Sequence, residues 1–335
     1  MIKTFNIKDF GPIKQVSCPN AGKINLVIGP NGTGKTILLK SLYAAIKTIE
    51  QNKRGKDSRK DYEILFEKLY WTFQIEQIGK MVRSGAKNSE FSIEIDKQQS
   101  FSYSFGTATE RLVKIKANTC KATKIDSIFI PAKEVLSLLD VILHSREIEK
   151  EFGFDETYYD LAKSLRIRPT KGKNYPEFSS SRSKLEGSLG GKLVYDEKDK
   201  EWIFKQGTRN YSISATSEGI KKMSILDILL GNHYLKKGAV VFIDEPEAAL
   251  HPSLISTFMD IIAVLTKAGL QFFISSHSYF VIKKLYLLAH QQDMSIPVIS
   301  FTNDNSVEYS NLKSEMPDNA IIDESIRLYK EEITL

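Results

Sequence analysis

The stretch INLVIGPNGTGKTILLKSLYAAI, residues 24–46, decides how the rest of the chain is interpreted. Its first five residues form a run that is apolar except for Asn25 and ends at Gly-Pro, which is typical of a buried strand. From Lys35 onward the apolar residues follow a helical spacing on one face, at Leu38, Leu42, Ala45, Ile46 and Ile49. We therefore expect a buried strand, a glycine-rich turn and a helix, in that order.

Within this stretch, GPNGTGKT, residues 29–36, fits the phosphate-binding pattern G-x-x-x-x-G-K-[ST]. Its glycines allow backbone N–H groups to turn inward around phosphates, and the start of the helix adds a partial positive charge. Lys35 is expected to reach the β and γ phosphate oxygens, and Thr36 to bind Mg²⁺. ATP and Mg²⁺ are thus the predicted cofactors, and the predicted nucleotide-binding residues are Gly29, Pro30, Asn31, Gly32, Thr33, Gly34, Lys35, Thr36 and Ile37. An ordinary glycine-rich turn is the alternative.

A second motif, AVVFIDEPEAALHP, occupies residues 239–252. Its apolar run predicts a strand that delivers Asp244 and Glu245 to the strand end. With a phosphate-binding loop in the same chain, Asp244 is expected to bind Mg²⁺, and Glu245 to be the catalytic base that polarises the attacking water. The alternative is that these two acids only cap the helix that follows and favour its first turn.

A third motif, QFFISSHS at residues 271–278, places His277 just beyond an apolar strand. His277 follows Glu245 by one strand-helix-strand unit, so the two strands can lie side by side with both carboxyl ends at one crevice. The imidazole could then contact the γ-phosphate or the attacking water. His277, Glu245 and Lys35 are therefore the predicted catalytic residues, and a histidine with a purely structural place is the alternative.

Ser217 and Gly219 lie in ATSEGIKKM, residues 215–223, at the start of a helical pattern. The order of phosphate-binding loop, Ser-x-Gly, Asp-Glu and histidine resembles the ATP-binding-cassette (ABC) class of ATPases. In that class the Ser-x-Gly helix docks against a nucleotide held by a second subunit. The resemblance therefore implies that Ser217 and Gly219 also bind nucleotide, and that the chain forms a homodimer or higher oligomer through composite ATP sites. A plain helix cap is the alternative for Ser217.

Two departures from the transporter cassettes direct the resemblance to a soluble branch of this class. Transporters usually have Leu-Ser-Gly-Gly-Gln at the signature, and their usual Ser-Ala-Leu-Asp after the acidic pair is Ala-Ala-Leu-His-Pro at residues 248–252 here. Together with FGPIKQV, residues 10–16, these features resemble the RecF/SMC branch. Within that branch the chain is similar to the OLD-type (overcoming lysogenisation defect) ATPases of phage-defence systems.

The resemblance covers residues 1–50 and 210–301, and the middle of the chain only weakly. No glutamine matches the family's Q-loop, and the segment Pro131 to Glu134 is the candidate for that place. The sequence has no heptads long enough for the coiled-coil arms of SMC proteins and no Cys-x-x-Cys hook. Only 34 residues follow Phe301, fewer than the roughly 50 of an independent domain, so we expect no nuclease domain of the OLD kind. Any destructive chemistry is expected in a separate effector protein, a nuclease or a toxin.

The charge balance permits several kinds of partner. Forty-seven basic and 41 acidic residues give a net charge of +6, which is compatible with nucleic-acid contact without being diagnostic of it. No run of 18 apolar residues occurs, so we expect no membrane span and no signal peptide, and a cytoplasmic protein. Nucleic acid is a possible partner because basic residues gather in two stretches, Lys53, Arg54, Lys56, Arg59 and Lys60, and then Arg166, Arg168, Lys171, Lys173, Arg182 and Lys184.

The predicted fold is an α/β P-loop NTPase of the two-lobed ABC-ATPase kind, with a mixed or parallel central sheet, because strands and helices alternate in the last third of the chain. An antiparallel β hairpin is expected over residues 2–9 and 13–17, and a helix over 61–82. Helices are also expected over 133–150 and 155–166, whereas 168–187 has little apolar periodicity and is predicted to be a mobile insertion.

The predicted division of the chain has four parts. The first ATPase lobe, with the phosphate-binding loop and a small β meander, covers 1–132, and a helical, basic insertion covers 133–190. The second lobe covers 191–312, and a helical tail covers 313–335. The predicted function is an ATPase that dimerises on ATP and acts as a sensor or regulator for the separate effector, with phage defence resting on the resemblance alone. Two alternatives stay open: a nucleotide-gated scaffold that hardly hydrolyses ATP, and a RecF-like repair ATPase that binds DNA directly.

Overall fold

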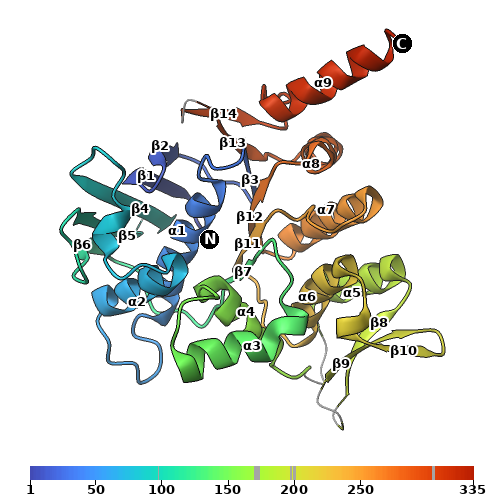
Figure 1. Cartoon of the computed structure of the whole chain (residues 1–335), viewed down its shortest axis with the longest axis horizontal. Helices are drawn as coiled ribbons and strands as arrows, with labels where there is room; N and C mark the ends of the chain where they lie inside the picture. Colours follow the sequence, from blue (N-terminus) through green and yellow to red (C-terminus); the bar gives the residue numbers. More distant parts are fainter. Residues whose placement is uncertain (97, 170–173, 197, 199–200, 304–305) are drawn as a thin grey trace.

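The computed structural model describes residues 1–96, 98–169, 174–196, 198, 201–303 and 306–335. A six-stranded sheet stands at its centre, in the order β14-β13-β3-β12-β11-β7 (Figure 1). Five of these strands run parallel and β14 pairs antiparallel to β13 at the edge. The strands are β3 (Ile24–Ile28), β7 (Ile128–Ile130), β11 (Val240–Asp244), β12 (Gln271–Ser276), β13 (Pro297–Phe301) and β14 (Val307–Asn311). The predicted α/β class with a mixed central sheet is confirmed.

The central sheet separates two hydrophobic cores, and alternate residues of each strand enter one or the other. On β11, Ile243 packs in the core that also holds α6 (Glu218–Gly231), α7 (Pro252–Lys267) and α8 (Tyr279–Gln291), whereas Phe242 packs in the core around α1 (Lys35–Gln51). Figure 1 shows α1 and the N-terminal strands on one side of the sheet and α6, α7 and α8 on the other. Because both faces are covered, β3, β11 and β12 are buried along their whole length, as their mainly apolar sequences predict.

A second sheet is antiparallel, with its strands in the order β2-β1-β4-β5-β6. Its side chains pack in the same hydrophobic core as those of α1. It contains the predicted hairpin and meander as β1 (Thr4–Phe10), β2 (Ile13–Cys18), β4 (Asn88–Asp96), β5 (Gln99–Gly106) and β6 (Lys114–Asn118). The helix predicted over 61–82 was too long, since α2 (Asp61–Phe73) ends where Gln74 takes a left-handed cap and only a 3₁₀ turn (Ile78–Met81) follows. Gly79 is needed in that turn because a Cβ there would lie 2.2 Å from the Thr107 carbonyl oxygen.

The middle of the chain is more regular than its composition suggests. Part of the predicted mobile insertion is a helix, α5 (Pro176–Leu189), so that prediction was wrong there, and residues 170–173 lie outside the described part of the chain. The helix begins with proline in its first turn and ends at Gly190, and it buries only Phe178, Ser181 and Leu185 against the core that holds α6 and α7. Three buried positions in fourteen residues give too weak a periodicity to be recognised.

The helix predicted over 133–150 is also interrupted. A 3₁₀ turn (Leu136–Leu138), the short α3 (Leu139–His144) and a π turn (Ser145–Glu149) replace it, and α4 (Glu156–Leu165) follows as predicted. Next comes a three-stranded sheet, β10-β9-β8, formed by β8 (Lys192–Asp196), β9 (Glu201–Gln206) and β10 (Arg209–Ser212). The tail ends in a helix, α9 (Ala320–Glu332), which projects from the body toward the C-terminus in Figure 1. Within the described residues no helix is both long and apolar enough to cross a membrane.

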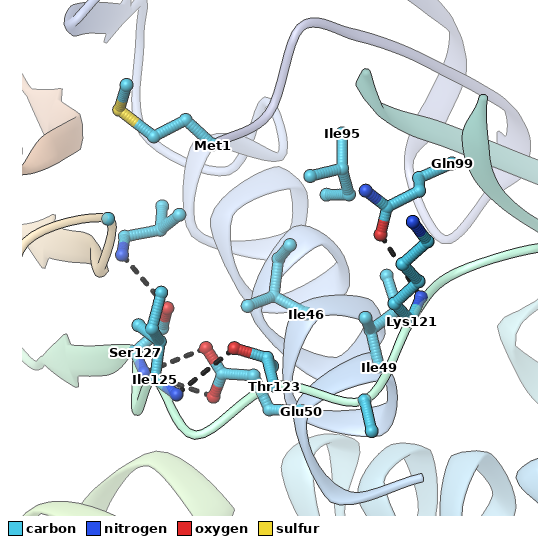
Figure 2. A pocket seen from close by; sticks show the side chains of 13 residues that line it. Met1, Ile46, Ile49, Glu50, Ile95, Gln99, Lys121, Thr123, Ile125 and Ser127 are labelled. Carbon is cyan, nitrogen blue, oxygen red and sulfur yellow. Dashed lines mark hydrogen bonds between the residues drawn. The ribbon is translucent and has the colours of Figure 1, made fainter. Parts of the chain in front are cut away.

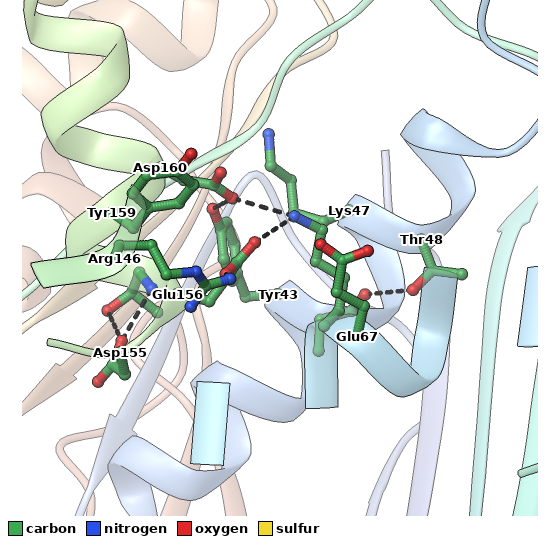
Figure 3. A network of polar contacts seen from close by, with 12 residues as sticks. Tyr43, Lys47, Thr48, Glu67, Arg146, Asp155, Glu156, Tyr159 and Asp160 are labelled. Carbon is green, nitrogen blue, oxygen red and sulfur yellow. Dashed lines mark hydrogen bonds and ion pairs between the residues drawn. The ribbon is translucent and has the colours of Figure 1, made fainter. Parts of the chain in front are cut away.

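A buried network of charges joins α1 and α2 to α4 (Figure 3). The Tyr43 hydroxyl donates to Asp160 at 2.6 Å, and Lys40 pairs with Asp155, the N-cap of α4, at 2.6 Å. Arg146 pairs with Glu156 and lies over the Trp71 ring, 3.3 Å from its centroid. Separating the members of a buried pair leaves an uncompensated charge, which is costly. The network therefore opposes any movement of α1 relative to α4.

Candidate functional site

The loop between β3 and α1 has the backbone that its glycines permit. Gly29, Gly32 and Gly34 all have positive φ angles of 141°, 81° and 108°. A side chain at Gly29 would also collide with β13, because its Cβ would lie 2.6 Å from the Phe301 carbonyl oxygen. Glycine is therefore required here both for conformation and for close approach of the sheet, as the phosphate-binding pattern predicts.

Lys35 begins α1 and its ammonium group lies inside this loop. The ammonium donates to the carbonyl oxygens of Gly29 and Pro30, at 2.8 and 2.9 Å. Burial lowers the pKa of Lys35, and the carboxylates of Glu245 and Asp244 oppose that shift. A cation surrounded by loop carbonyls and facing two acids is suited to exchange its acceptors for the oxygens of a phosphate.

Asp244 ends β11 and joins three segments of the chain. The Thr36 hydroxyl donates to both of its carboxylate oxygens at 3.0 Å, and the Ser275 hydroxyl of β12 donates to Oδ1. Burial raises the pKa of Asp244, while these hydroxyl donors act in the opposite direction. The structure thus brings together the two predicted metal ligands, which are far apart in the sequence.

The oxygen atoms of Thr36 and Asp244 are of the type that Mg²⁺ binds. Mg²⁺ takes oxygen ligands and is usually held by one or two protein groups together with phosphates and water, so the hydroxyl of Thr36 and the carboxylate of Asp244 suffice on the protein side. Asp244 is 8% exposed, so its carboxylate is largely desolvated, and a bound cation would offset that cost more fully than hydroxyl donors alone. This cost is consistent with a carboxylate kept for metal binding.

Glu245 and His277 meet at the ends of neighbouring strands. His277 Nδ1 lies 3.2 Å from Glu245 Oε1, which confirms the predicted placement side by side. The acids are not caps of the next helix, because α7 begins at Pro252 and its N-cap is His251, whose side chain accepts from the Ser253 N–H. Capping is therefore excluded as the explanation of the acidic pair.

Glu247 and Lys222 belong to the same site, and the sequence interpretation missed both. Glu247 Oε1 accepts from the Ser276 hydroxyl and the His277 N–H, both at 2.8 Å, while its Oε2 is buried without a hydrogen-bond partner. Lys222 Nζ donates to the carbonyl oxygens of Glu245 at 2.5 Å and Ala132 at 3.3 Å. Burial lowers the pKa of Lys222 to about 8, with Glu247 the strongest opposing charge. The second acid after Asp244, which is Glu247, and the two adjacent lysines after Gly219 were the available signals.

Ser217 and Gly219 lie at the start of α6. Ser217 is exposed and its hydroxyl accepts from the Ile220 N–H at 3.4 Å, so it has the geometry of an N-cap. Gly219 is buried, and a Cβ there would lie 2.9 Å from the Ala249 carbonyl oxygen. Gly219 thus allows α6 to dock on the turn after β11, while Ser217 faces solvent.

The predicted basic stretches are partly neutralised within the chain. Most of their arginines pair with acids, and so does one lysine: Arg54 with Asp126, Arg59 with Asp57 and Glu67, Arg166 with Asp140, Arg182 with Asp227, and Lys184 with Asp260. Lys171 and Lys173 lie outside the described residues. Paired charges release fewer counterions from a polyanion, so these stretches offer less to nucleic acid than their composition suggests.

A cavity of about 300 Å³ lies elsewhere, next to Ser127 and Val240 at the amino ends of β7 and β11 (Figure 2). Apolar side chains including Ile46 and Ile125 line it, and the Glu50 carboxylate at its wall accepts from the Ser127 N–H at 2.9 and 3.0 Å. It therefore lies at the opposite end of the strands from Asp244, and it holds none of the predicted site residues.

A family model described as "AAA domain, putative AbiEii toxin, Type IV TA system" matches residues 24–283. The match runs from β3 into α8 and includes every predicted site residue from Gly29 to His277. A search of curated proteins gave no match.

Among solved structures, SMC head domains are similar to this chain. One, the SmcHead bound to the C-winged helix domain of ScpA, is 15% identical with a TM-score of 0.57, over 92% of this chain and 97% of that one. The Smc head domain with an extended coiled coil bound to the C-terminal domain of ScpA, from Pyrococcus furiosus, is 13% identical with a TM-score of 0.55, over 98% of each chain. The SMC head domain from Thermotoga maritima is 12% identical with a TM-score of 0.50, over 92% of this chain and 98% of that one. At these identities the similarity shows a common fold.

Neutralising Asp244 should stabilise the nucleotide-free protein. A carboxyl whose pKa is raised by folding contributes stability below its unfolded pKa and loses that contribution as the pH rises through the folded value. At pH 7 the buried charge is therefore a cost, and Asp244→Asn should raise the free energy of unfolding by about 1 kcal/mol. Urea unfolding at pH 7 and at acidic pH measures this, and the difference from wild type should shrink at acidic pH.

The matched control is Asp293→Asn, which changes an exposed acid paired with Lys313 and should bring no gain in stability. A loss of stability in Asp244→Asn at pH 7, equal at both pH values, would contradict the account of a costly buried charge.

Proposed function

The chain belongs to the AAA-domain family whose model matches residues 24–283, and from that premise we propose that it binds Mg·ATP at the carboxyl edge of the central sheet and hydrolyses it between two copies of the chain. Family and fold make it a P-loop ATPase of the SMC and ABC kind. The observation that carries the proposal is the convergence of Lys35, Thr36, Asp244, Glu245 and His277 in one place.

For binding, the proposal assigns the phosphates to the loop of residues 29–37. Its left-handed glycines and the start of α1 present N–H groups, and Lys35 supplies the positive charge that would pair with the β and γ phosphates. Thr36 and Asp244 would hold Mg²⁺, which when bound neutralises charge on these phosphates. The Lys35 ammonium would exchange the carbonyl oxygens of Gly29 and Pro30 for phosphate oxygens.

For hydrolysis, Glu245 is the proposed base. Its carboxylate takes a proton from water as the water oxygen bonds to the γ-phosphorus and the bond to ADP breaks. His277, 3.2 Å from Glu245, would orient the carboxylate and contact the γ-phosphate. Glu247 Oε1 accepts from the His277 backbone N–H and lies 3.5 Å from His277 Nδ1, so Glu247 helps to hold the histidine beside Glu245.

Glu245→Gln separates hydrolysis from binding. The amide fills the same space but is a poor base, so ATP affinity should stay within about threefold of wild type while kcat falls by a factor on the order of 10² to 10⁴. Lys35→Ala should lose ATP binding, and Lys267→Ala, an exposed lysine at the end of α7, should behave as wild type in both assays. Equilibrium binding of a fluorescent ATP analogue and phosphate release measure the two properties.

Two outcomes of these assays count against the proposal. Undiminished turnover in Glu245→Gln would remove Glu245 as the base. A wild-type protein that binds ATP without turnover would favour the alternative of a nucleotide-gated scaffold.

The second copy enters through Ser217. The γ-phosphate would already have Lys35, His277 and the Mg²⁺ held by Asp244 on its own chain, so its remaining face is open to another molecule. Ser217 is exposed at the start of α6, where backbone N–H groups suit an anion. In a two-fold dimer each chain would supply one phosphate-binding loop and one Ser-x-Gly, which gives two composite sites and lets ATP bridge the subunits.

A mixing experiment tests the composite site. Ser217→Arg should spare ATP binding by the monomer but block ATP-driven dimerisation and turnover, because the bulky side chain occupies the place of the phosphate. Mixing Lys35→Ala chains with Ser217→Arg chains gives heterodimers with one intact composite site, so activity should rise above that of either parent. Heterodimers that form yet stay as inactive as their parents would argue against a shared site. Normal assembly and turnover in Ser217→Arg would leave Ser217 as a helix cap only.

The wider setting extends the same proposal. We place the ATPase in the cytoplasm as the sensor or regulator of a separate effector, a nuclease or toxin, in phage defence. The support is the family description, which names a toxin system, and the similar SmcHead structure, which is bound to the C-winged helix domain of another protein, ScpA. A RecF-like role with direct DNA binding is less favoured because several arginines of the basic stretches, Arg54, Arg166 and Arg182, pair with acids of the chain.

A further inference from the structure

The peptide that presents Glu245 has an unusual conformation. Glu245 has a φ of 47°, in the left-handed region that non-glycine residues seldom adopt. Such a conformation is strained and persists only where the surroundings impose it. The direction of the Glu245 carboxylate therefore depends on the contacts that hold its backbone.

Those contacts come from both sides of the residue. The Glu245 N–H donates to the Ser275 carbonyl of β12 at 3.0 Å, which continues the pairing of the two strands. The Glu245 carbonyl accepts from the Ala248 N–H at 3.0 Å and from Lys222 Nζ at 2.5 Å. Of these three partners of the Glu245 backbone, only the Lys222 ammonium comes from outside β11, β12 and the turn that follows β11.

Lys222 reaches this carbonyl from α6. Its side chain is buried, and its ammonium also donates to the Ala132 carbonyl in the segment after β7. Burying an ammonium among carbonyls is costly, and an apolar side chain of similar size would fill the slot without that cost. The lysine therefore performs a task beyond packing at this position.

We propose that Lys222 is a positioning residue, whose ammonium fixes the left-handed peptide of Glu245 and ties it to the first turns of α6. Lys222 lies little more than one helical turn after Ser217, and Gly219 brings the same helix against the turn after β11. The base of one ATP site and the exposed Ser-x-Gly proposed to reach the other site are thus joined through one short, rigid segment. This inference rests on the proposed role of Glu245 as the base.

Lys222→Met removes the donor and keeps an apolar chain of similar length. The Glu245 peptide can then relax, and its carboxylate moves relative to His277, while the phosphate-binding loop stays intact. We expect kcat to fall by about 10- to 100-fold, because small misplacements of a catalytic group have effects of that order. KM for ATP should stay within about threefold of wild type, a split that a general loss of structure would not produce.

Lys221→Met is the matched control. Lys221 neighbours Lys222 on α6 and its side chain is equally buried, but it pairs with Glu218 on its own helix at 3.0 Å. Its kcat and KM should both stay within about threefold of wild type. If Lys222→Met is too unstable to purify, Lys222→Leu, an apolar side chain that also lacks a hydrogen-bond donor, serves the same comparison.

A crystal structure of Lys222→Met tests the inference without relying on turnover. We expect residue 245 to leave the left-handed region and Glu245 Oε1 to move away from His277 Nδ1, which lies 3.2 Å from it in the wild type. If the wild type proves inactive, the proposed function fails, and this structure still decides the role of Lys222. An unchanged Glu245 backbone, or a kcat within threefold of wild type in an active enzyme, would overturn the inference.

Discussion

A carboxylate buried at the end of a parallel strand is the constraint on which this site depends. Asp244 ends β11, between β7 and β12, and Thr36 from α1 and Ser275 from β12 donate to it. Only a sheet whose neighbouring strands end at one edge can bring these segments together, and only the sharp turn at Gly34 directs α1 toward that edge. The fold therefore serves to hold one desolvated negative charge next to a loop shaped for phosphates.

The turn after β11 concentrates the energetic cost of this arrangement. It contains two residues other than glycine with left-handed backbone conformations, Glu245 and Ala249. Gly219 of α6 packs closely against the same turn, at the Ala249 carbonyl. A buried ammonium, Lys222, and a buried carboxylate oxygen without a partner, on Glu247, lie beside it. Strain and unbalanced charge of this kind are characteristic of sites whose geometry is kept for chemistry.

Much of the central sheet and of the site could be predicted from the sequence, because short sequence patterns indicate both. A mainly apolar strand, a glycine pattern and a change to helical spacing are sufficient to place Lys35 and Thr36. The alternation of strands and helices after residue 217 then places Asp244, Glu245 and His277 at one edge. These predictions need only the geometry of parallel sheets.

The remainder depended on contacts that a single segment does not reveal. The helix α5 has only three buried positions, so its own sequence pattern gives little indication that it packs against the neighbouring helices. Lys222 looks like one of two surface lysines, and only the fold shows that it is buried against the Glu245 carbonyl. The pairing of basic stretches with distant acids, such as Arg54 with Asp126, was hidden for the same reason.

The central claim is that Mg·ATP is held by one chain and closed over by a second copy. Native mass spectrometry of Glu245→Gln with Mg·ATP tests it most directly, because this variant should bind ATP without consuming it. The account predicts a species of two chains with two ATP molecules, formed from monomers only when nucleotide is present. A monomer with one bound ATP at every protein concentration, or a dimer that forms equally well without ATP, would contradict it.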